Sequence, residues 1–168
     1  MSQTIENNNS WIIIKDYNFD PSEYDHWTEW SDFNTFVPAL FLMLHGFELV
    51  MKGLLIWSGN SIIKSHNAAF MLKELEVIQK IDRELLAILS KYIGSNIKSE
   101  VLKRFLSLNS QLSSDNLHVD IRYPESKGRT VDFMPMKFRE DEIIEELKEI
   151  VCDIDLVLKK SIKMTKGN

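Results

Sequence analysis

Apolar residues are concentrated in one long stretch of the chain, residues 36–58, in which almost every position is apolar. When these residues are placed at 100° steps around a helix, the three polar side chains His45, Glu48 and Lys52 fall within an arc of about 60°. The rest of the circumference is Leu, Phe, Met, Val and Ile. A helix that is apolar nearly all round is normally buried, so the pattern predicts a central core helix.

The same stretch is longer than the about 20 residues that span a bilayer, so a membrane helix is the alternative. Three features favour a soluble bundle instead. Glu48 and Lys52 lie near the middle of the stretch, no basic flank precedes it, and the amphipathic segments after it need a packing partner. We expect the helix to begin at an N-cap at Asn34 or Thr35, with Pro38 in its first turn, and to stop after Trp57.

Two more helices are predicted at the two ends of the chain. Asp20, Pro21 and Glu23 form a capping-box arrangement that predicts a helix over residues 21–32. The last helix is predicted from about residue 140 to 164, because apolar residues recur there at heptad-like spacing. Its first turns carry acidic residues and its last turns carry lysines, which is the order that the helix dipole favours.

Three short amphipathic helices are predicted between the central and the last helix. Their predicted N-caps, in chain order, are Ser65, Asp82 and Asn96. The first covers residues 68–78 and places Phe70 on its apolar side together with Met71, Leu75 and Ile78. The second ends at Gly94, and the third reaches about residue 112.

The helical pattern lapses between residues 113 and 136. Leu117, Val119 and Ile121 alternate with polar residues, which predicts a short extended segment before a polar turn over residues 125–130. The predicted fold is therefore all-α, an up-and-down bundle of about five or six helices with one long irregular connection. A connection of this length in a compact domain often has a function.

Composition indicates one soluble domain. The chain has 168 residues, of which 44% are apolar, enough for one core and too short for two comfortable ones. We expect residues 1–10 to be disordered and residues 11–168 to form a single domain. The lone Cys152, the absence of a secretory signal and the absence of zinc-spaced Cys and His residues predict a cytoplasmic protein without metal or cofactor.

Charge is distributed unevenly along the chain. Residues 16–51 contain seven acids and no Lys or Arg, whereas residues 52–104 contain nine bases and five acids. The simpler explanation is pairing between these regions within or between subunits. The alternative is that the basic part faces a partner that carries phosphate.

Three short motifs together resemble the HEPN family of small helical bundles. They are FELVMKGLL on the central helix, SHNAAFMLKEL at the start of the next helix, and IRYPES before the last helix. The resemblance covers about residues 36–162. It implies a four- or five-helix up-and-down bundle, usually a homodimer, linked to nucleotide or RNA handling. Such domains often stand beside a nucleotidyltransferase or belong to toxin–antitoxin or antiphage systems.

The ribonuclease branch of that family carries an Arg, four to six intervening residues, and then a His. No His in this chain has an Arg five to seven positions before it. Arg122, the family-like Arg, is followed at the relevant positions by Lys127, Gly128 and Arg129. An imidazole for general acid or base work is therefore missing from the expected place. If the chain is catalytic, the candidates are Arg122 with His66 or His118.

The candidate ligand-binding residues are Glu48, Lys52, His66, Asn67, Arg122, Tyr123, Lys127 and Arg129. Glu48 and Lys52, four residues apart, are either an ordinary structural pair or a polar stripe that lines a groove or interface. His66 and Asn67 either join the first turn of a helix or receive an anion there. The last four residues form the most concentrated basic and aromatic loop in the chain.

Three functions fit these residues. The first is a non-catalytic HEPN-like dimer that binds a nucleotide, an RNA segment or a partner protein in the groove between the central helix and the loop at residues 122–129. The second is a divergent, metal-independent ribonuclease in which His66 or His118 replaces the missing base. The third is a structural partner of a neighbouring nucleotidyltransferase. The missing motif favours the first function.

Overall fold

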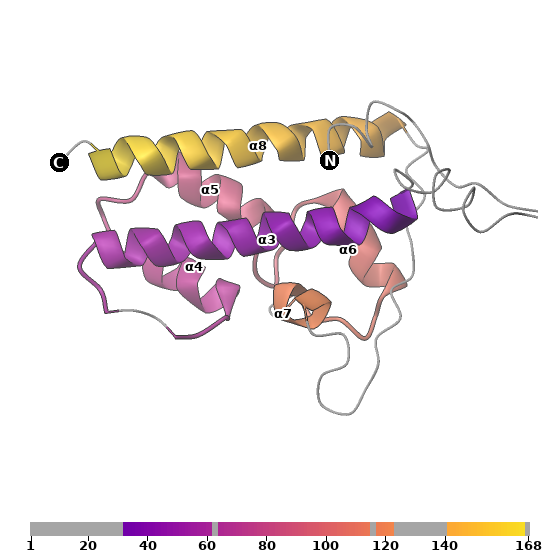
Figure 1. Ribbon diagram of the computed structural model, residues 1–168, viewed down its shortest axis with the longest axis horizontal. Helices are drawn as coiled ribbons and strands as arrows, with labels where there is room; N and C mark the ends of the chain where they lie inside the picture. Colours follow the sequence, from indigo (N-terminus) through magenta and orange to yellow (C-terminus); the bar gives the residue numbers. More distant parts are fainter. Residues whose placement is uncertain (1–31, 62–63, 115–116, 123–140, 167–168) are drawn as a thin grey trace, which may run out of the picture.

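The computed structural model describes residues 32–61, 64–114, 117–122 and 141–166. These residues form six helices and, within the described ranges, no strand, which confirms the all-α bundle (Figure 1). The predicted helix over residues 21–32 and the predicted disorder of residues 1–10 lie outside the described residues. The labels below follow Figure 1.

The central helix α3, Asp32–Trp57, is longer than predicted. It begins at Asp32, so Asn34 and Thr35 lie within the helix and the prediction of an N-cap there is wrong. Pro38 consequently stands inside the helix, where it lacks the N–H that would donate to the carbonyl of Asn34. The start of the helix was predicted too late because proline prefers the first turn of a helix. In the structure, α3 extends about six residues on the N-terminal side of Pro38.

The predicted end of α3 is confirmed. Gly59 has a φ of 95°, and the amides of Ser58, Gly59 and Asn60 donate back to carbonyls of the last helical turn at 2.9–3.0 Å. A residue with positive φ at this position is the usual way to stop a helix, and glycine adopts it without strain.

The short helix α4, Ala68–Glu76, is capped by Asn67 and not by the predicted Ser65. The Asn67 side chain accepts a hydrogen bond from the amide of Phe70 at 2.8 Å, whereas the Ser65 hydroxyl accepts from the amide of Asn67 at 3.0 Å. Phe70 was predicted on the buried side, but it is 46% exposed, and Leu72 is buried instead.

Helix α5, Arg83–Tyr92, starts as predicted, because Asp82 accepts hydrogen bonds from the first-turn amides of Glu84 and Leu85. Helix α6, Glu100–Leu108, is capped by Ser99 and not by Asn96. The Ser99 hydroxyl accepts from the amide of Leu102 and donates to Glu146 of α8 at 2.6 Å. This hydrogen bond to α8 explains why Ser99, and not the nearby Asn96, caps α6.

Residues Leu117–Arg122 form a short helix, α7, and the predicted extended segment is wrong. Leu117 and Ile121 are both buried and are four residues apart, so they share one face of a helix that packs against α3. The last helix, α8, Asp141–Lys166, is confirmed, with lysines in its last turn.

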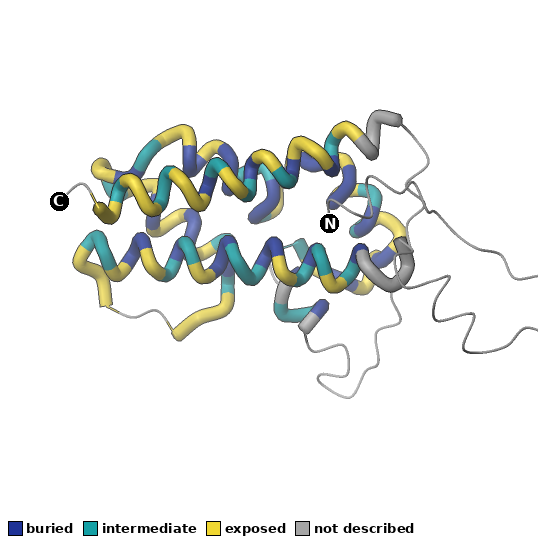
Figure 2. The backbone as a smooth tube through the Cα atoms, turned by 45° about the horizontal axis from the view of Figure 1, so that its top comes forward, coloured by how far each residue is buried: buried dark blue, intermediate teal, exposed yellow. Residues whose placement is uncertain are grey.

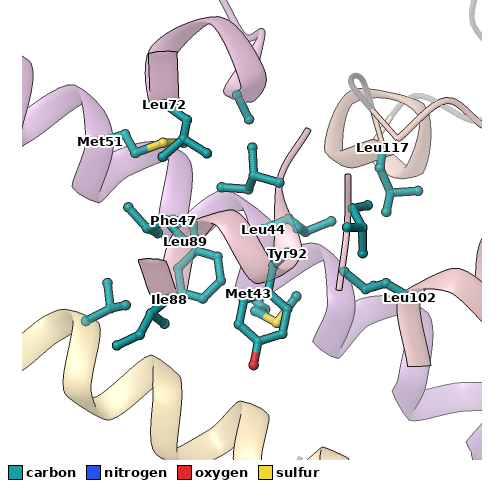
Figure 3. Close-up of a cluster of buried hydrophobic side chains, with 14 of the residues drawn as sticks. Met43, Leu44, Phe47, Met51, Leu72, Ile88, Leu89, Tyr92, Leu102 and Leu117 are labelled. Atoms are coloured by element: carbon teal, nitrogen blue, oxygen red, sulfur yellow. The ribbon is translucent and has the colours of Figure 1, made fainter. Parts of the chain in front are cut away.

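The two 26-residue helices, α3 and α8, pack side by side and run in the same direction (Figure 1). The remaining helices pack against this pair, α4 and α7 against α3 and α5 and α6 against α8. Side chains of α3, including Met43, Leu44, Phe47 and Met51, meet residues of the short helices in one core (Figure 3). The described ranges thus share a single hydrophobic cluster.

The segment Phe36–Trp57 is long and apolar enough to cross a membrane by length and composition alone. In the bundle, 44% of its most apolar window is buried against the other helices. This packing is compatible with a soluble protein.

Candidate functional site

A buried carboxylate on α3 gathers three basic side chains around it. Glu48 is 1% exposed, and its Oε1 accepts a hydrogen bond from Lys52 Nζ at 2.6 Å. The same oxygen lies 2.9 Å from Nδ1 of His66, which comes from the residues just before α4. Because a carboxylate only accepts hydrogen bonds, Nδ1 of His66 carries the proton of this contact.

His45 completes the group, which we call the polar cluster: His45, Glu48, Lys52 and His66. The Nδ1 of His45 lies 3.5 Å from Oε2 of Glu48, longer than the about 2.7–3.2 Å of a good hydrogen bond. Its ring is stacked on that of Phe41, with centroids 5.5 Å apart and planes at 8°. His45 is therefore held by stacking more than by the carboxylate.

The polar cluster joins α3 to the residues that directly precede α4. Glu48 and Lys52 lie one turn apart on α3, while His66 is 18 residues further along the chain than Glu48. A carboxylate removed from water is costly unless it is paired, so each donor offsets part of that cost. The cluster consequently fixes the start of α4 against the middle of α3.

The structure thus brings together three of the predicted ligand-binding candidates, Glu48, Lys52 and His66, with His45 beside them. Asn67, the next candidate, acts as the N-cap of α4. The link between Glu48 and His66 could not be read from the spacing, because it depends on how the connection after α3 folds back.

The side chains of the other candidates are not described by the structure. Arg122 is the last residue of α7 and His118 its second, but the side chains of both lie outside the described residues. Tyr123, Lys127 and Arg129 also lie outside the described residues. The described part of the predicted groove is therefore limited to α3 and the packing of α7 against it.

A cavity of about 540 Å³ opens beside α4, where the connection from α5 to α6 passes it. We call it the α4 pocket. Its lining combines amide, hydroxyl, apolar and charged side chains: Asn67, Ala69, Phe70, Leu72, Lys73, Glu76, Ser90, Ile93, Gly94, Ser95, Asn96 and Lys98. Of these residues, only Asn67 was predicted from the sequence as a candidate for ligand binding. The exposure of Phe70 marks the pocket, but periodicity predicts that this residue is buried, so the sequence carries no signal for it.

The α4 pocket has a positive balance of charge. The lining contains two lysines, Lys73 and Lys98, and one carboxylate, that of Glu76. Within residues 32–61, 64–114, 117–122 and 141–166, no acidic side chain forms an ion pair with either lysine, whereas Lys52, Lys91 and Lys160 are each paired. The two ammonium groups are therefore available to a ligand.

In the described part of the chain, no three His, Cys, Asp or Glu side chains are grouped closely enough to hold a metal ion. Comparisons with protein-family models, with curated proteins and with solved structures find no match to this chain.

Proposed function

We propose that this chain is a HEPN-like, non-catalytic module that binds a nucleotide or a short segment of single-stranded RNA in the α4 pocket. One observation carries the proposal: an exposed phenyl ring, Phe70, lines a cavity together with two lysines that lack ion-pair partners in the described structure.

The chemistry of the lining suits such a ligand. An exposed aromatic ring offers a stacking surface for a base, and base stacking on aromatic side chains contributes about 1–3 kcal/mol per base. The ammonium groups of Lys73 and Lys98 offer charge to a phosphate. The Asn and Ser side chains add donors and acceptors for a sugar or base edge, and the volume of about 540 Å³ lies in the range of small-molecule sites.

The polar cluster has a supporting part in this proposal. His66, bound to Glu48, precedes Asn67, and Asn67 both caps α4 and lines the α4 pocket. Fixing the start of α4 to α3 holds Asn67 and Phe70 in place before a ligand arrives. A site that is already ordered loses less entropy on binding.

A second candidate function, the divergent ribonuclease, is favoured by one contact. A carboxylate on one nitrogen of an imidazole is the arrangement that orients a general base, and Glu48 makes such a contact with His66. In this alternative His66 would remove a proton and Arg122 would stabilise the phosphate. Two features favour the binding module over the enzyme. Lys52 donates to the same carboxylate oxygen, and the family motif is missing.

The test is a titration of the full chain with fluorescently labelled single-stranded RNA and with ADP at two salt concentrations. We expect binding that weakens as salt rises, because cationic contacts to phosphate release counterions. The double variant Lys73→Gln, Lys98→Gln should weaken binding at least about tenfold, and Phe70→Ala should weaken it by a similar factor.

Matched controls distinguish the effect of the pocket residues from the effect of removing charge or apolar surface elsewhere. Lys103→Gln with Lys148→Gln removes the same charge at two exposed positions outside the pocket, and Val77→Ala removes an exposed apolar side chain beyond the end of α4. Equal losses in pocket and control variants would contradict the proposal. RNA cleavage that is lost in His66→Gln would favour the ribonuclease instead.

A further inference from the structure

Another cavity, of about 660 Å³, lies at the end of the bundle where α3 and α8 both terminate (Figure 1). It is lined by Trp57, the last residue of α3, by Lys80 and Asp82 between α4 and α5, and by residues of α8 between positions 156 and 164. Exposed residues recur on these last turns of α8, close to the C-terminus (Figure 2). We call this cavity the α8 pocket.

The lining of the α8 pocket contains four lysines, two of which are paired with carboxylates. Lys160 lies 2.8 Å from a carboxylate oxygen of Asp82 and 2.6 Å from one of Glu84. Lys159 lies 2.6 Å from a carboxylate oxygen of Asp155. The charges of these two lysines are therefore already neutralised by α5 and α8.

The other two lysines, Lys80 and Lys163, have no carboxylate partner in the part of the chain that the structure describes. Lys80 is nevertheless held in place. Its Nζ lies 4.3 Å from the centroid of the Trp57 ring and donates to the Trp57 carbonyl at 3.4 Å. Both acceptors are uncharged, and the C-terminus of a helix such as α3 carries only about half a negative charge. The ammonium group of Lys80 is thus positioned at the pocket with most of its charge uncompensated.

The uncharged part of the lining is apolar. Trp57, Leu156 and Met164 are partly buried hydrophobic residues packed against the core. Unlike the α4 pocket, the described lining of the α8 pocket has no amide and no hydroxyl side chain. The edge of a base or a sugar would find few hydrogen-bond partners there, whereas a ligand with one anionic end and one apolar end would find both kinds of surface.

The type of cation favours phosphate over carboxylate. The described lining contains lysines and no arginine. A planar guanidinium matches a planar carboxylate through two parallel hydrogen bonds, whereas an ammonium group acts as a point charge that can approach a tetrahedral oxyanion from any side. Two ammonium groups without partners match two negative charges, and a phosphate monoester carries about −1.5 to −2 at pH 7.

We propose that the α8 pocket binds a phosphate monoester with an apolar substituent. Lys80 and Lys163 bind the phosphate, and Leu156 and Met164 contact the substituent. Such a group occurs both in soluble metabolites and in the head group of phosphatidic acid, and the chemistry shared by the two is a doubly charged phosphate next to apolar surface. The proposal does not depend on the ligand of the α4 pocket.

The test is isothermal titration calorimetry with phenyl phosphate as the probe. The titration uses the full chain with Lys73→Gln and Lys98→Gln, so that the α4 pocket does not contribute. We expect phenyl phosphate to bind about tenfold more tightly than inorganic phosphate, because the ring is removed from water. Phenyl sulfate has a similar shape and one negative charge, so it should bind about tenfold more weakly than phenyl phosphate.

Variants of the lining separate the two parts of the ligand. Lys80→Gln and Lys163→Gln should each weaken the binding of phenyl phosphate at least about fivefold. The matched control is Lys166→Gln, which removes the same charge from the last turn of α8 outside the lining and should change binding less than about twofold. Met164→Ala should weaken phenyl phosphate and leave inorganic phosphate unchanged. Circular dichroism checks that each variant keeps its helices.

Sedimentation with phosphatidylcholine vesicles, with and without phosphatidic acid, identifies the source of the phosphate. Sedimentation that requires phosphatidic acid and is lost in Lys80→Gln assigns the pocket to the lipid, and binding of phenyl phosphate without sedimentation assigns it to a soluble ester. Failure to bind either one would overturn the proposal. Equal losses in Lys80→Gln and Lys166→Gln would overturn it too, as would equal affinities for phenyl phosphate and phenyl sulfate. None of these results bears on RNA binding at the α4 pocket, which its own variants test.

Discussion

Removing Lys52 tests whether the polar cluster stabilises the fold. In Lys52→Met the side chain keeps most of its volume but can no longer donate to Glu48, which is 1% exposed and therefore cannot recover the lost hydrogen bond from bulk water. His66 still donates to the same oxygen at 2.9 Å. The Glu48 carboxylate therefore loses one of two donors to that oxygen and keeps the other.

The expected magnitude lies between two limits. Breaking a fully buried ion pair typically costs about 3–5 kcal/mol, and an exposed pair contributes under about 1 kcal/mol. Lys52 is 21% exposed and His66 is 54% exposed, so each donor regains water when the partner is lost, whereas Glu48 does not. A single hydrogen bond to a charged group contributes about 1.5–3 kcal/mol, so we expect Lys52→Met to lower the free energy of unfolding by about 2 kcal/mol.

A double-mutant cycle isolates the shared carboxylate. In Glu48→Gln the charge is gone, so Lys52→Met should then cost under about 0.5 kcal/mol, which gives a coupling energy of about 1.5 kcal/mol between the two residues. The measurement is urea unfolding followed by circular dichroism, at one protein concentration because dimerisation would shift the midpoint. Additive losses of a few tenths of a kcal/mol would show that the cluster is ordinary surface and refute the reasoning.

Two further contacts give testable outcomes. Hydrogen bonding from Lys160 lowers the pKa of Asp82 below its ordinary value of 3.8, so the stabilisation is full above about pH 4 and is lost as the pH falls through the folded-state pKa. Asp82→Asn keeps the N-cap of α5 but loses the ion pair with Lys160. Its melting temperature should therefore lie below that of the wild type at neutral pH and equal it in acid. A difference that does not depend on pH would exclude the ion pair as its cause. Burial and the hydrogen bond to Asp153 raise the pKa of the Tyr92 hydroxyl, which donates at 2.7 Å. Tyr92→Phe should cost about 1.5–3 kcal/mol in urea unfolding, because Asp153 keeps only its bond from Lys91, and a loss under about 0.3 kcal/mol would contradict this.

Helix positions followed from the sequence where one local signal dominated. Asp82 directly precedes the periodic segment of α5, and Gly59 supplies the positive φ that ends α3. The cap of α6 did not follow, because Asn96 and Ser99 are both good caps and only the contact of Ser99 with Glu146 decides between them. That contact joins residues 47 positions apart, which no local pattern encodes.

The α7 segment shows how two periods can coexist in a short run. Leu117, Val119 and Ile121 alternate like a strand, yet Leu117 and Ile121 are also one helical turn apart. Packing against α3 buries Leu117 and Ile121 and leaves Val119 partly exposed, so the bundle favours the helical period. In a run of six residues, tertiary packing decides between the two.

The candidate site was partly accessible from the sequence. The pairing of Glu48 with Lys52 follows from the spacing of four residues on one helix, and the structure has it. The contact of His66 with the same carboxylate depends on the connection between α3 and α4, and the α4 pocket depends on a second connection, between α5 and α6. Sites assembled from connections therefore escape an analysis based on helical periodicity.

The composition of α3 reflects the different surroundings of its faces. One face, with Phe47 and Met51, fills the core, and a second, with Glu48 and Lys52, holds the start of α4. The core face makes the segment Phe36–Trp57 long and apolar enough to cross a membrane by length and composition, although the Glu48 and Lys52 pair lies near its middle. On the remaining face, Leu42, Leu49 and Ile56 are exposed in the described structure, so α3 carries more apolar residues than its core face alone requires.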